Sequence, residues 1–219
     1  MKGSIRRLII VIVCACAYAV PAWSWGQKGH RIIAKIAYDN LNCGTRKRVD
    51  KILGKGGIIY WANWADEIKS DTIYPDSYDW HFQDFNGGMS DSLVADALVH
   101  YPAEGGNLFR ALDSLLVESQ RSKVEKADVL KFIVHLSGDR YCPMHMAHMD
   151  DKGGNTVRMA WFSKQPNTNL HAVWDTKLID SQGYSYTEYA QKIEREYAWK
   201  KKQIQKMSDA EMLGQSYHM

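Results

Sequence analysis

Cysteine is scarce in the chain, which holds four among its 219 residues. Two of them, Cys14 and Cys16, lie in an apolar N-terminal run, so only Cys43 and Cys142 remain beyond it. This number excludes a disulfide-rich scaffold. The two remaining cysteines could form one disulfide or stay as two buried thiols, and their positions in the sequence do not decide between these alternatives.

Long hydrophobic runs are also rare. The one clear run, Leu8–Val20, is too short to span a bilayer comfortably, and no later segment is long and apolar enough. Basic residues precede this run and Ala22-Trp23-Ser24 follows it, which is typical of a signal peptide with its cleavage site. We therefore expect residues 1–24 to be removed, Trp25 to become the first residue, and the protein to be secreted or periplasmic without membrane attachment.

An excess of one charge sign is missing as well. The formal net charge is +3, and three basic residues belong to the expected signal peptide, so residues 25–219 are formally neutral. A protein that binds nucleic acid by displacing counterions would be more basic. An anionic substrate would therefore need locally bound cations. There is no repeat or linker either, so we expect residues 25–219 to form a single domain.

Apolar residues recur at helical spacing through most of the chain, which predicts a mainly helical, all-α fold. A weakly alternating stretch, 156–162, follows a Gly-Gly-Asn turn and predicts a small β-hairpin with the residues before Leu170. Residues 209–219 look like the start of a further helix, and we expect the chain to lack its natural C-terminal helix. The expected helices span 26–41, 45–53, 58–68, 91–101, 107–120, 127–137, 171–179 and 186–207.

Two histidine–aspartate pairs are the strongest chemical signal. His135 and Asp139 are four residues apart in a helical segment, as are His171 and Asp175, so each pair lies on one helix face. Pro143 should end the first helix and let His145 turn back towards the same space. Imidazole and carboxylate donors suit zinc. The alternative is that the pairs only form salt bridges. Three other histidines are not part of such a pair and are expected to be ordinary residues: His100, His148 and His218.

Several motifs, in order along the chain, resemble the S1/P1 nuclease family. This resemblance implies a secreted nuclease with three zinc ions, a phospholipase C/nuclease-type helical fold, and a preference for single-stranded nucleic acid. The motifs are Trp25-Gly26-x-x-Gly29-His30, Trp64-Ala65-Asp66, His81-Phe82, His135-x3-Asp139-x3-Pro143-Met144-His145, Gly153-Gly154-Asn155 and Asn169-Leu170-His171-x2-Trp174-Asp175.

The resemblance also implies which residues bind the metals. Asp139 would bridge two ions, of which the second is also held by His30 and by the α-amine and carbonyl oxygen of Trp25. Cleavage of the signal peptide would then complete part of the site. The first ion would be bound by Asp66, His81, His135 and Asp139, and the third by His145, His171 and Asp175.

Four further residues match substrate-handling positions of the family. Lys69 would clamp phosphate, Phe82 would stack on a base, Asp84 would lie near the base and the attacking water, and Asn155 would contact phosphate or base. The implied activity is endonucleolytic hydrolysis of single-stranded DNA and RNA by a monomer to 5′-phosphate products, with 3′-nucleotidase activity on nucleotides.

Two other functions stay open at this stage. A zinc phospholipase C shares the helical fold and the N-terminal Trp ligand, although its last ligand is typically Glu rather than Asp175. A non-catalytic exported zinc-binding protein is the other alternative. Tyr141 and Cys142 depart from the S1/P1 pattern, which often has His and Gln there, but they leave the expected ligands intact.

Overall fold

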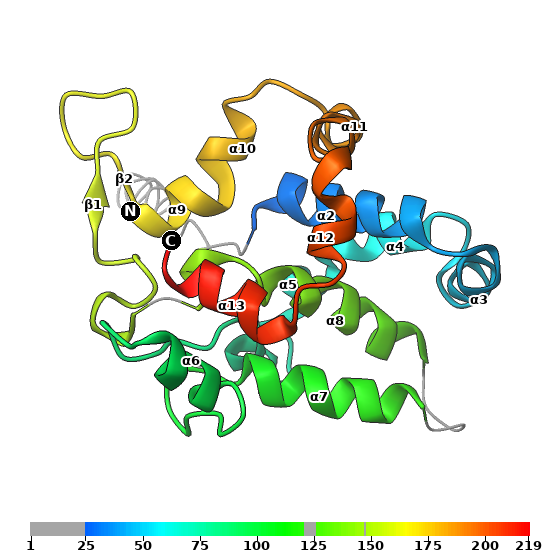
Figure 1. Cartoon of the computed structure of the whole chain (residues 1–219), viewed down its shortest axis with the longest axis horizontal. Helices are drawn as coiled ribbons and strands as arrows, with labels where there is room; N and C mark the ends of the chain where they lie inside the picture. The colour runs from blue at the N-terminus through cyan, green and yellow to red at the C-terminus, as the bar shows by residue number, and fades with distance from the viewer. Residues whose placement is uncertain (1–24, 121–125, 147) are drawn as a thin grey trace, which may run out of the picture.

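Helix α8 (Lys126–Asp139) lies at the centre of the protein and pairs with α7 (Leu108–Ser119). The computed structural model describes residues 25–120, 126–146 and 148–219, and Figure 1 shows the two helices side by side at the lower edge of this view. Phe132 and Leu136 of α8 pack on Leu108 and Leu112 of α7 in one buried cluster. This packing places the C-terminal turn of α8, with His135 and Asp139, inside the molecule.

Helix α2 (Gln27–Asn40) forms the second layer. Helix α11 (Tyr186–Glu196) packs against α2 and lies above it in Figure 1, and its N-terminus carries a capping box in which Ser185 and Glu188 satisfy each other's backbone amides. On its other side α2 contributes Ala34 to a core cluster with α3 (Cys43–Leu53) and α4 (Gly57–Tyr60). These contacts fix the start of α2, and therefore His30, against α8.

Short helical segments complete the fold and carry most of the chemically interesting residues. Helix α6 (Asp91–Ala97) packs against α13 (Asp209–Tyr217), near the end of the chain. The remaining segments are η1 (Trp61–Asn63), α5 (Trp64–Ile68), η2 (Ser77–His81), η3 (Pro143–His145), η4 (Met149–Asp151), α9 (Leu170–Ala172), η5 (Val173–Lys177), α10 (Leu178–Asp180), η6 (Ala198–Lys200) and α12 (Lys201–Ile204).

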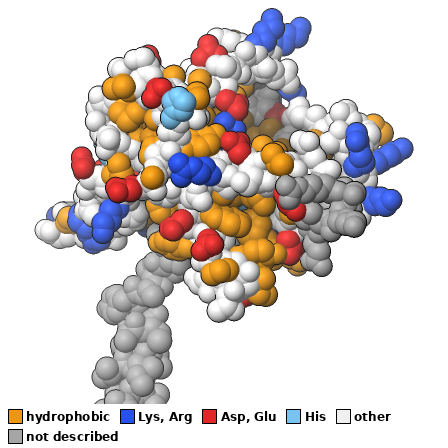
Figure 2. All heavy atoms as spheres, turned by 90° about the horizontal axis from the view of Figure 1, so that it is seen from below, with side chains coloured by type: hydrophobic (Ala, Val, Ile, Leu, Met, Phe, Trp, Pro, Cys, Tyr) orange, Lys and Arg blue, Asp and Glu red, His pale blue; other side chains and the backbone are white. Residues whose placement is uncertain are grey.

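The predicted mainly helical class and its small hairpin are confirmed. Strands β1 (Arg158–Met159) and β2 (Thr168–Asn169) pair antiparallel, with Arg158 opposite Asn169. Within the described ranges no helix is long and apolar enough to cross a membrane. Figure 2 shows acidic and basic side chains interspersed with apolar ones over the face that it displays, which agrees with the near-neutral charge.

Two predicted helices were too long, and two are divided into shorter segments. The range 171–179 forms α9, η5 and α10, and the range 58–68 forms α4, η1 and α5, with Trp61 (φ −88°, ψ 5°) and Asn63 (φ −102°, ψ −2°) at the two boundaries of the latter. The helix predicted over 186–207 ends at Glu196, where Tyr197 (φ −105°, ψ 10°) leaves helical geometry. The one predicted over 91–101 ends at Ala97, and Pro102 disfavours helical geometry in the residue before it.

Candidate metal centre

The side chains predicted as metal ligands meet in the interior, between α2, α8 and the short segments. They come from parts of the chain more than a hundred residues apart, and all are less than 9% exposed. They are His30 on α2, Asp66 on α5, His81 on η2, His135 and Asp139 on α8, His145 on η3, His171 on α9 and Asp175 on η5.

The first cluster is centred on Asp139 Oδ2. The distance from this oxygen is 3.1 Å to His81 Nδ1 and 3.3 Å to His135 Nε2, and the two nitrogens are 3.1 Å apart. Asp66 Oδ1 lies 3.6 Å from His81 Nδ1 and 3.7 Å from His135 Nε2. Four donor atoms therefore converge on one small volume.

The other oxygen of Asp139 connects this cluster to its neighbours. Asp139 Oδ1 is 3.3 Å from His30 Nε2 and 3.6 Å from His145 Nδ1. The ring of His30 also stacks on that of His135, with centroids 3.8 Å apart. Gly138 permits this approach, because a Cβ there would lie 3.0 Å from His30 Nδ1. Asp139 thus connects His81 and His135 with His30 and His145.

The second cluster consists of His145, His171 and Asp175. His171 Nε2 is 2.9 Å from Asp175 Oδ2, and His145 Nε2 is 3.7 Å from Asp175 Oδ1. The rings of the two histidines stack with centroids 5.2 Å apart. Helix α8 ends at Asp139, so Pro143 does not end it as predicted; Pro143 opens the 3-10 turn η3 after residues 140–142. The prediction that His145 turns back towards Asp139 is confirmed.

Backbone carbonyls fix the orientation of three histidine rings. His135 Nδ1 lies 2.7 Å from Ala62 O, His145 Nδ1 lies 2.6 Å from His81 O, and His171 Nδ1 lies 2.8 Å from Gly153 O. Each Nδ1–H can donate to its carbonyl, which leaves Nε2 as the atom available for a metal. Metal-binding histidines generally have such partners.

The electrostatics of the centre favour ionised carboxylates. Burial raises the pKa of Asp139, but the surrounding His135, His145 and His30 outweigh burial and hold it well below its usual range. In the same way His145 and His171 overcome burial and lower the pKa of Asp175 to about 2. Burial lowers the pKa of His145, yet Asp139 and Asp175 together raise it to about 9. In the metal-free centre, His145 therefore carries a proton at a position where a metal cation could bind.

The geometry fits metal ions of the size and preference of zinc. A tetrahedral ion with bonds of about 2.0–2.1 Å holds its ligands roughly 3.3 Å apart, close to the 3.1–3.7 Å found in the first cluster. Among the buried side-chain atoms of the described residues that have no hydrogen-bond partner, four belong to predicted ligands: Asp66 Oδ2, His81 Nε2, His145 Nε2 and Asp175 Oδ2. A bound cation would satisfy donor atoms that are costly to bury unpaired.

A cavity of about 400 Å³ opens beside both clusters. Its lining contains all four residues predicted to handle substrate, Lys69, Phe82, Asp84 and Asn155, together with His81, His145 and His171. Lys69 Nζ donates to Asp66 Oδ1 at 3.2 Å. The pKa of Asp84 is raised to about 7 by burial, although His145 and His171 oppose this. The structure thus brings the predicted metal ligands and substrate residues together.

The same cavity includes residues that the sequence analysis missed. Tyr78 lies edge-on to Phe82 with ring centroids 6.2 Å apart, and no sequence pattern indicated it. Lys152 and Met144 also line the cavity. Met144 belongs to the Pro143-Met144-His145 motif, and Lys152 directly precedes the Gly153-Gly154-Asn155 motif. Their positions in the sequence could therefore have indicated them.

Trp25 lies against the centre. Its indole Nε1 donates to Gly138 O at 2.9 Å, and its ring packs with Cys142 and Met144. The next residue, Gly26, donates its backbone N–H to Asp175 O at 2.8 Å. The backbone at the predicted cleavage point therefore passes between α8 and η5, the two elements that carry the main carboxylates.

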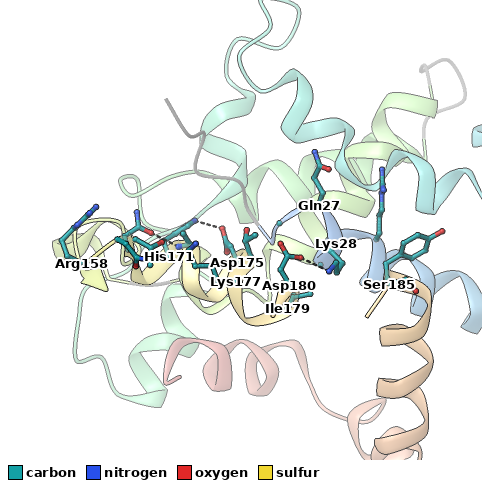
Figure 3. Close-up of a pocket in the computed structure, with 18 residues that line it drawn as sticks. Gln27, Lys28, Arg158, His171, Asp175, Lys177, Ile179, Asp180 and Ser185 are labelled. Carbon is teal, nitrogen blue, oxygen red and sulfur yellow. Dashed lines mark hydrogen bonds and ion pairs between the residues drawn. The ribbon is translucent and has the colours of Figure 1, made fainter. Parts of the chain in front are cut away.

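A larger cavity of about 990 Å³ has His171 and Asp175 in its lining. Figure 3 shows these two side chains pointing towards each other between Arg158 and the Lys28–Asp180 pair. Lys28 Nζ is 3.0 Å from Asp180 Oδ1. The lining of this larger cavity holds fewer of the predicted site residues than the smaller cavity does. The smaller cavity is therefore the candidate substrate site.

The remaining histidines and cysteines lie elsewhere or play other parts. His218 pairs with Asp91 at 2.7 Å, and His148 packs its ring against Tyr217. Both cysteines are free, so they do not form a disulfide; Cys43 is exposed, and Cys142 is buried beside Asp175.

Fold and site together define a mainly helical protein with a buried histidine–aspartate centre suited to several metal ions. The chain belongs to the S1/P1 nuclease family, whose family model matches residues 25–219. It is 28% identical to Endonuclease 2 of Arabidopsis thaliana over 196 residues, and 28% identical to Nuclease S1 of Aspergillus oryzae over 186. These matches cover 82% and 83% of this chain, but 64% and 63% of those relatives.

A third relative is Nuclease P1 of Penicillium citrinum, which is 28% identical over 180 residues. That match covers 75% of this chain and 63% of the relative. The chain thus spans a little under two thirds of the length of these proteins.

Proposed function

We propose that the protein is a secreted or periplasmic, zinc-dependent endonuclease that hydrolyses single-stranded DNA and RNA. The proposal includes three zinc ions, 5′-phosphate and 3′-hydroxyl products, 3′-nucleotidase activity on nucleotides, and a monomeric enzyme formed by residues 25–219 after removal of 1–24. The observation that carries it is the 400 Å³ cavity, in which a cation, an aromatic ring and a carboxyl group adjoin the metal centre. The names of the relatives, which are nucleases and endonucleases, support the same activity.

The metal ligands in this proposal are those that the sequence analysis predicted. One ion is held by Asp66, His81, His135 and Asp139, a second by Asp139, His30 and the Trp25 terminus, and a third by His145, His171 and Asp175. When bound, zinc supplies positive charge against a phosphate group and lowers the pKa of water at the site. The orienting carbonyls of Ala62, His81 and Gly153 support this assignment.

Lys69 and Asn155 hold the phosphate group in this proposal. The ammonium group of Lys69 lies at the cavity wall, 3.2 Å from Asp66, so it can interact with a phosphate oxygen beside the metal ligands. The side-chain amide of Asn155 lies 3.3 Å from His171 Nδ1 and lines the same cavity. Both side chains offer donors to a phosphate group bound there.

Phe82 and Asp84 select and orient the nucleotide. The ring of Phe82 offers a stacking surface for a base, which requires an unstacked base and therefore favours single strands. Asp84 Oδ1 is buried without a hydrogen-bond partner in the described structure, so it can accept a hydrogen bond from a base amino group or from the attacking water. Stacking does not distinguish bases, which agrees with a nuclease that accepts single strands of varied sequence.

The test compares hydrolysis of denatured DNA, native duplex DNA, RNA and phosphatidylcholine by the purified protein. We expect cleavage of the single strands, loss of activity with a chelator, and recovery with zinc. Phe82→Ala should reduce kcat/KM on single strands by roughly 5- to 150-fold, equivalent to about 1–3 kcal/mol per stacked base. The control is Tyr60→Ala, which removes an aromatic ring that is 70% exposed and outside the cavity.

Cleavage of lipid without cleavage of nucleic acid would contradict the proposal and favour a phospholipase C-type hydrolase. Zinc binding without any hydrolysis would favour a non-catalytic protein.

A further inference from the structure

Cys142 touches the metal centre although no metal role was predicted for it. Its Sγ lies 3.4 Å from Asp175 Oδ1, with the thiol as donor, and the residue is fully buried. Sγ and donor atoms of His145 and Asp175 all lie within 4.8 Å of one another. His145 Nε2, which is buried without a hydrogen-bond partner in the described structure, belongs to the same group of residues and provides a second indication that a ligand binds there.

The backbone of Cys142 is tied to two further residues of the centre. Its N–H donates to Asp139 O at 2.9 Å, and its C=O accepts from His145 N at 3.0 Å. The side chain therefore cannot move far from Asp175. One residue thus links the end of α8, the η3 turn and the η5 segment that carries Asp175.

The two oxygens of Asp175 have different partners. Oδ1 accepts from the thiol, whereas Oδ2 lies 2.9 Å from His171 Nε2. Figure 3 shows the carboxylate of Asp175 directed towards His171. A thiol that holds Oδ1 limits rotation of the carboxylate and keeps Oδ2 on the His171 side, where a metal would be shared with that histidine.

We infer that Cys142 is a positioning residue that orients the Asp175 carboxylate for the metal ion at His145, His171 and Asp175. This inference rests on the proposed function for the presence of that ion. The alternative is that sulfur binds the metal directly. Two histidines, a carboxylate and a thiolate would complete a tetrahedral set and leave no position for substrate, whereas catalytic zinc sites keep one open. The donor role is therefore favoured.

The experiment measures zinc affinity by competition with a chelator, and the absorption spectrum of the cobalt-loaded protein. Cys142→Ala should weaken binding of one ion by about 10- to 100-fold, as loss of an orienting partner does. Cys142→Ser should keep the affinity, because a hydroxyl of similar size also donates. Cys43→Ala, at the exposed cysteine, is the matched control and should have no effect. Circular dichroism shows whether each variant folds.

Unchanged affinity in Cys142→Ala would overturn the inference and leave Cys142 as a packing residue. A strong sulfur-to-cobalt charge-transfer band that is absent in Cys142→Ser would overturn it in favour of a direct ligand. If the unsubstituted protein bound no metal, the proposed function would fail together with the inference. If it bound metal and cleaved single strands while Cys142→Ala bound metal equally well, the inference alone would fail.

Discussion

Replacement of Asp139 by Asn should be the most damaging conservative change in the protein. Asn has nearly the same shape but no charge, so the substitution tests electrostatics rather than packing. Asp139 is fully buried, and its oxygens lie within 3.6 Å of His30, His81, His135 and His145. In the metal-free protein it balances the charge of His135 and His145, whose pKa values are raised by nearby carboxylates, whereas burial lowers the pKa values of His30 and His81. In the loaded protein we propose that it bridges two ions.

The size of the effect follows from the buried charges. Removing one partner of a buried ion pair costs about 3–5 kcal/mol. Independently, the rise in the pKa of His145 from 6.5 to about 9 corresponds to about 3 kcal/mol, provided by Asp139 and Asp175 together. Because the folded-state pKa is raised, this stabilisation is complete below pH 6.5 and is lost as the pH rises to about 9.

Urea unfolding of the chelator-treated protein measures this directly. We expect Asp139→Asn to unfold at clearly lower urea than the unsubstituted protein at pH 6, and the difference to shrink by pH 9. Asp180→Asn, which breaks the exposed pair with Lys28, should change stability by less than about 1 kcal/mol. Equal stability of Asp139→Asn and the unsubstituted protein at pH 6 would refute the charge assignment of the centre.

Three further predictions concern the terminus, the metals and Asp84. A protein that retains one extra residue before Trp25 should bind one fewer zinc ion by elemental analysis, since its α-amine would be displaced; full activity in that protein would contradict the terminal site. Zinc affinity at His145 should fall about tenfold per pH unit between about pH 8 and 6, because its pKa of about 9 makes a proton compete with the metal; a flat profile in a chelator competition would oppose this. The pKa of Asp84 is raised from 3.8 to about 7, so it destabilises the metal-free fold as the pH rises through that interval. Asp84→Asn should remove this slope in urea titrations from pH 4 to 7, and an unaltered slope would show that Asp84 titrates normally.

Local sequence patterns predicted the longer helices well, and failed where the chain is interrupted. The apolar spacing that predicts 107–120 and 127–137 corresponds to α7 and α8, because both helices bury one continuous face. Between Ile58 and Ile68 the same kind of spacing conceals three short segments. In α5 the side chain of Asp66 faces the centre, and in η1 the carbonyl of Ala62 orients His135. A pattern of hydrophobicity does not record such requirements.

The candidate site was predictable where two side chains that can bind a metal stand one helical turn apart in the sequence. His135 with Asp139, and His171 with Asp175, are readable as pairs because four residues make one helical turn. Tyr78 and the link from Cys142 to Asp175 had no such signal, since their partners belong to distant segments.

By itself, the sequence determined the helical class, the family and the identity of the residues that could bind metal, since these depend on residue type and on spacing within one turn. Only the tertiary structure decided that Asp139 faces four histidines, that Cys142 meets Asp175, and that Lys69, Phe82, Asp84 and Asn155 share one cavity. These relations depend on how α2, α8 and the short segments pack. Distances between atoms of separate segments are fixed by that packing and not by the order of residues along the chain.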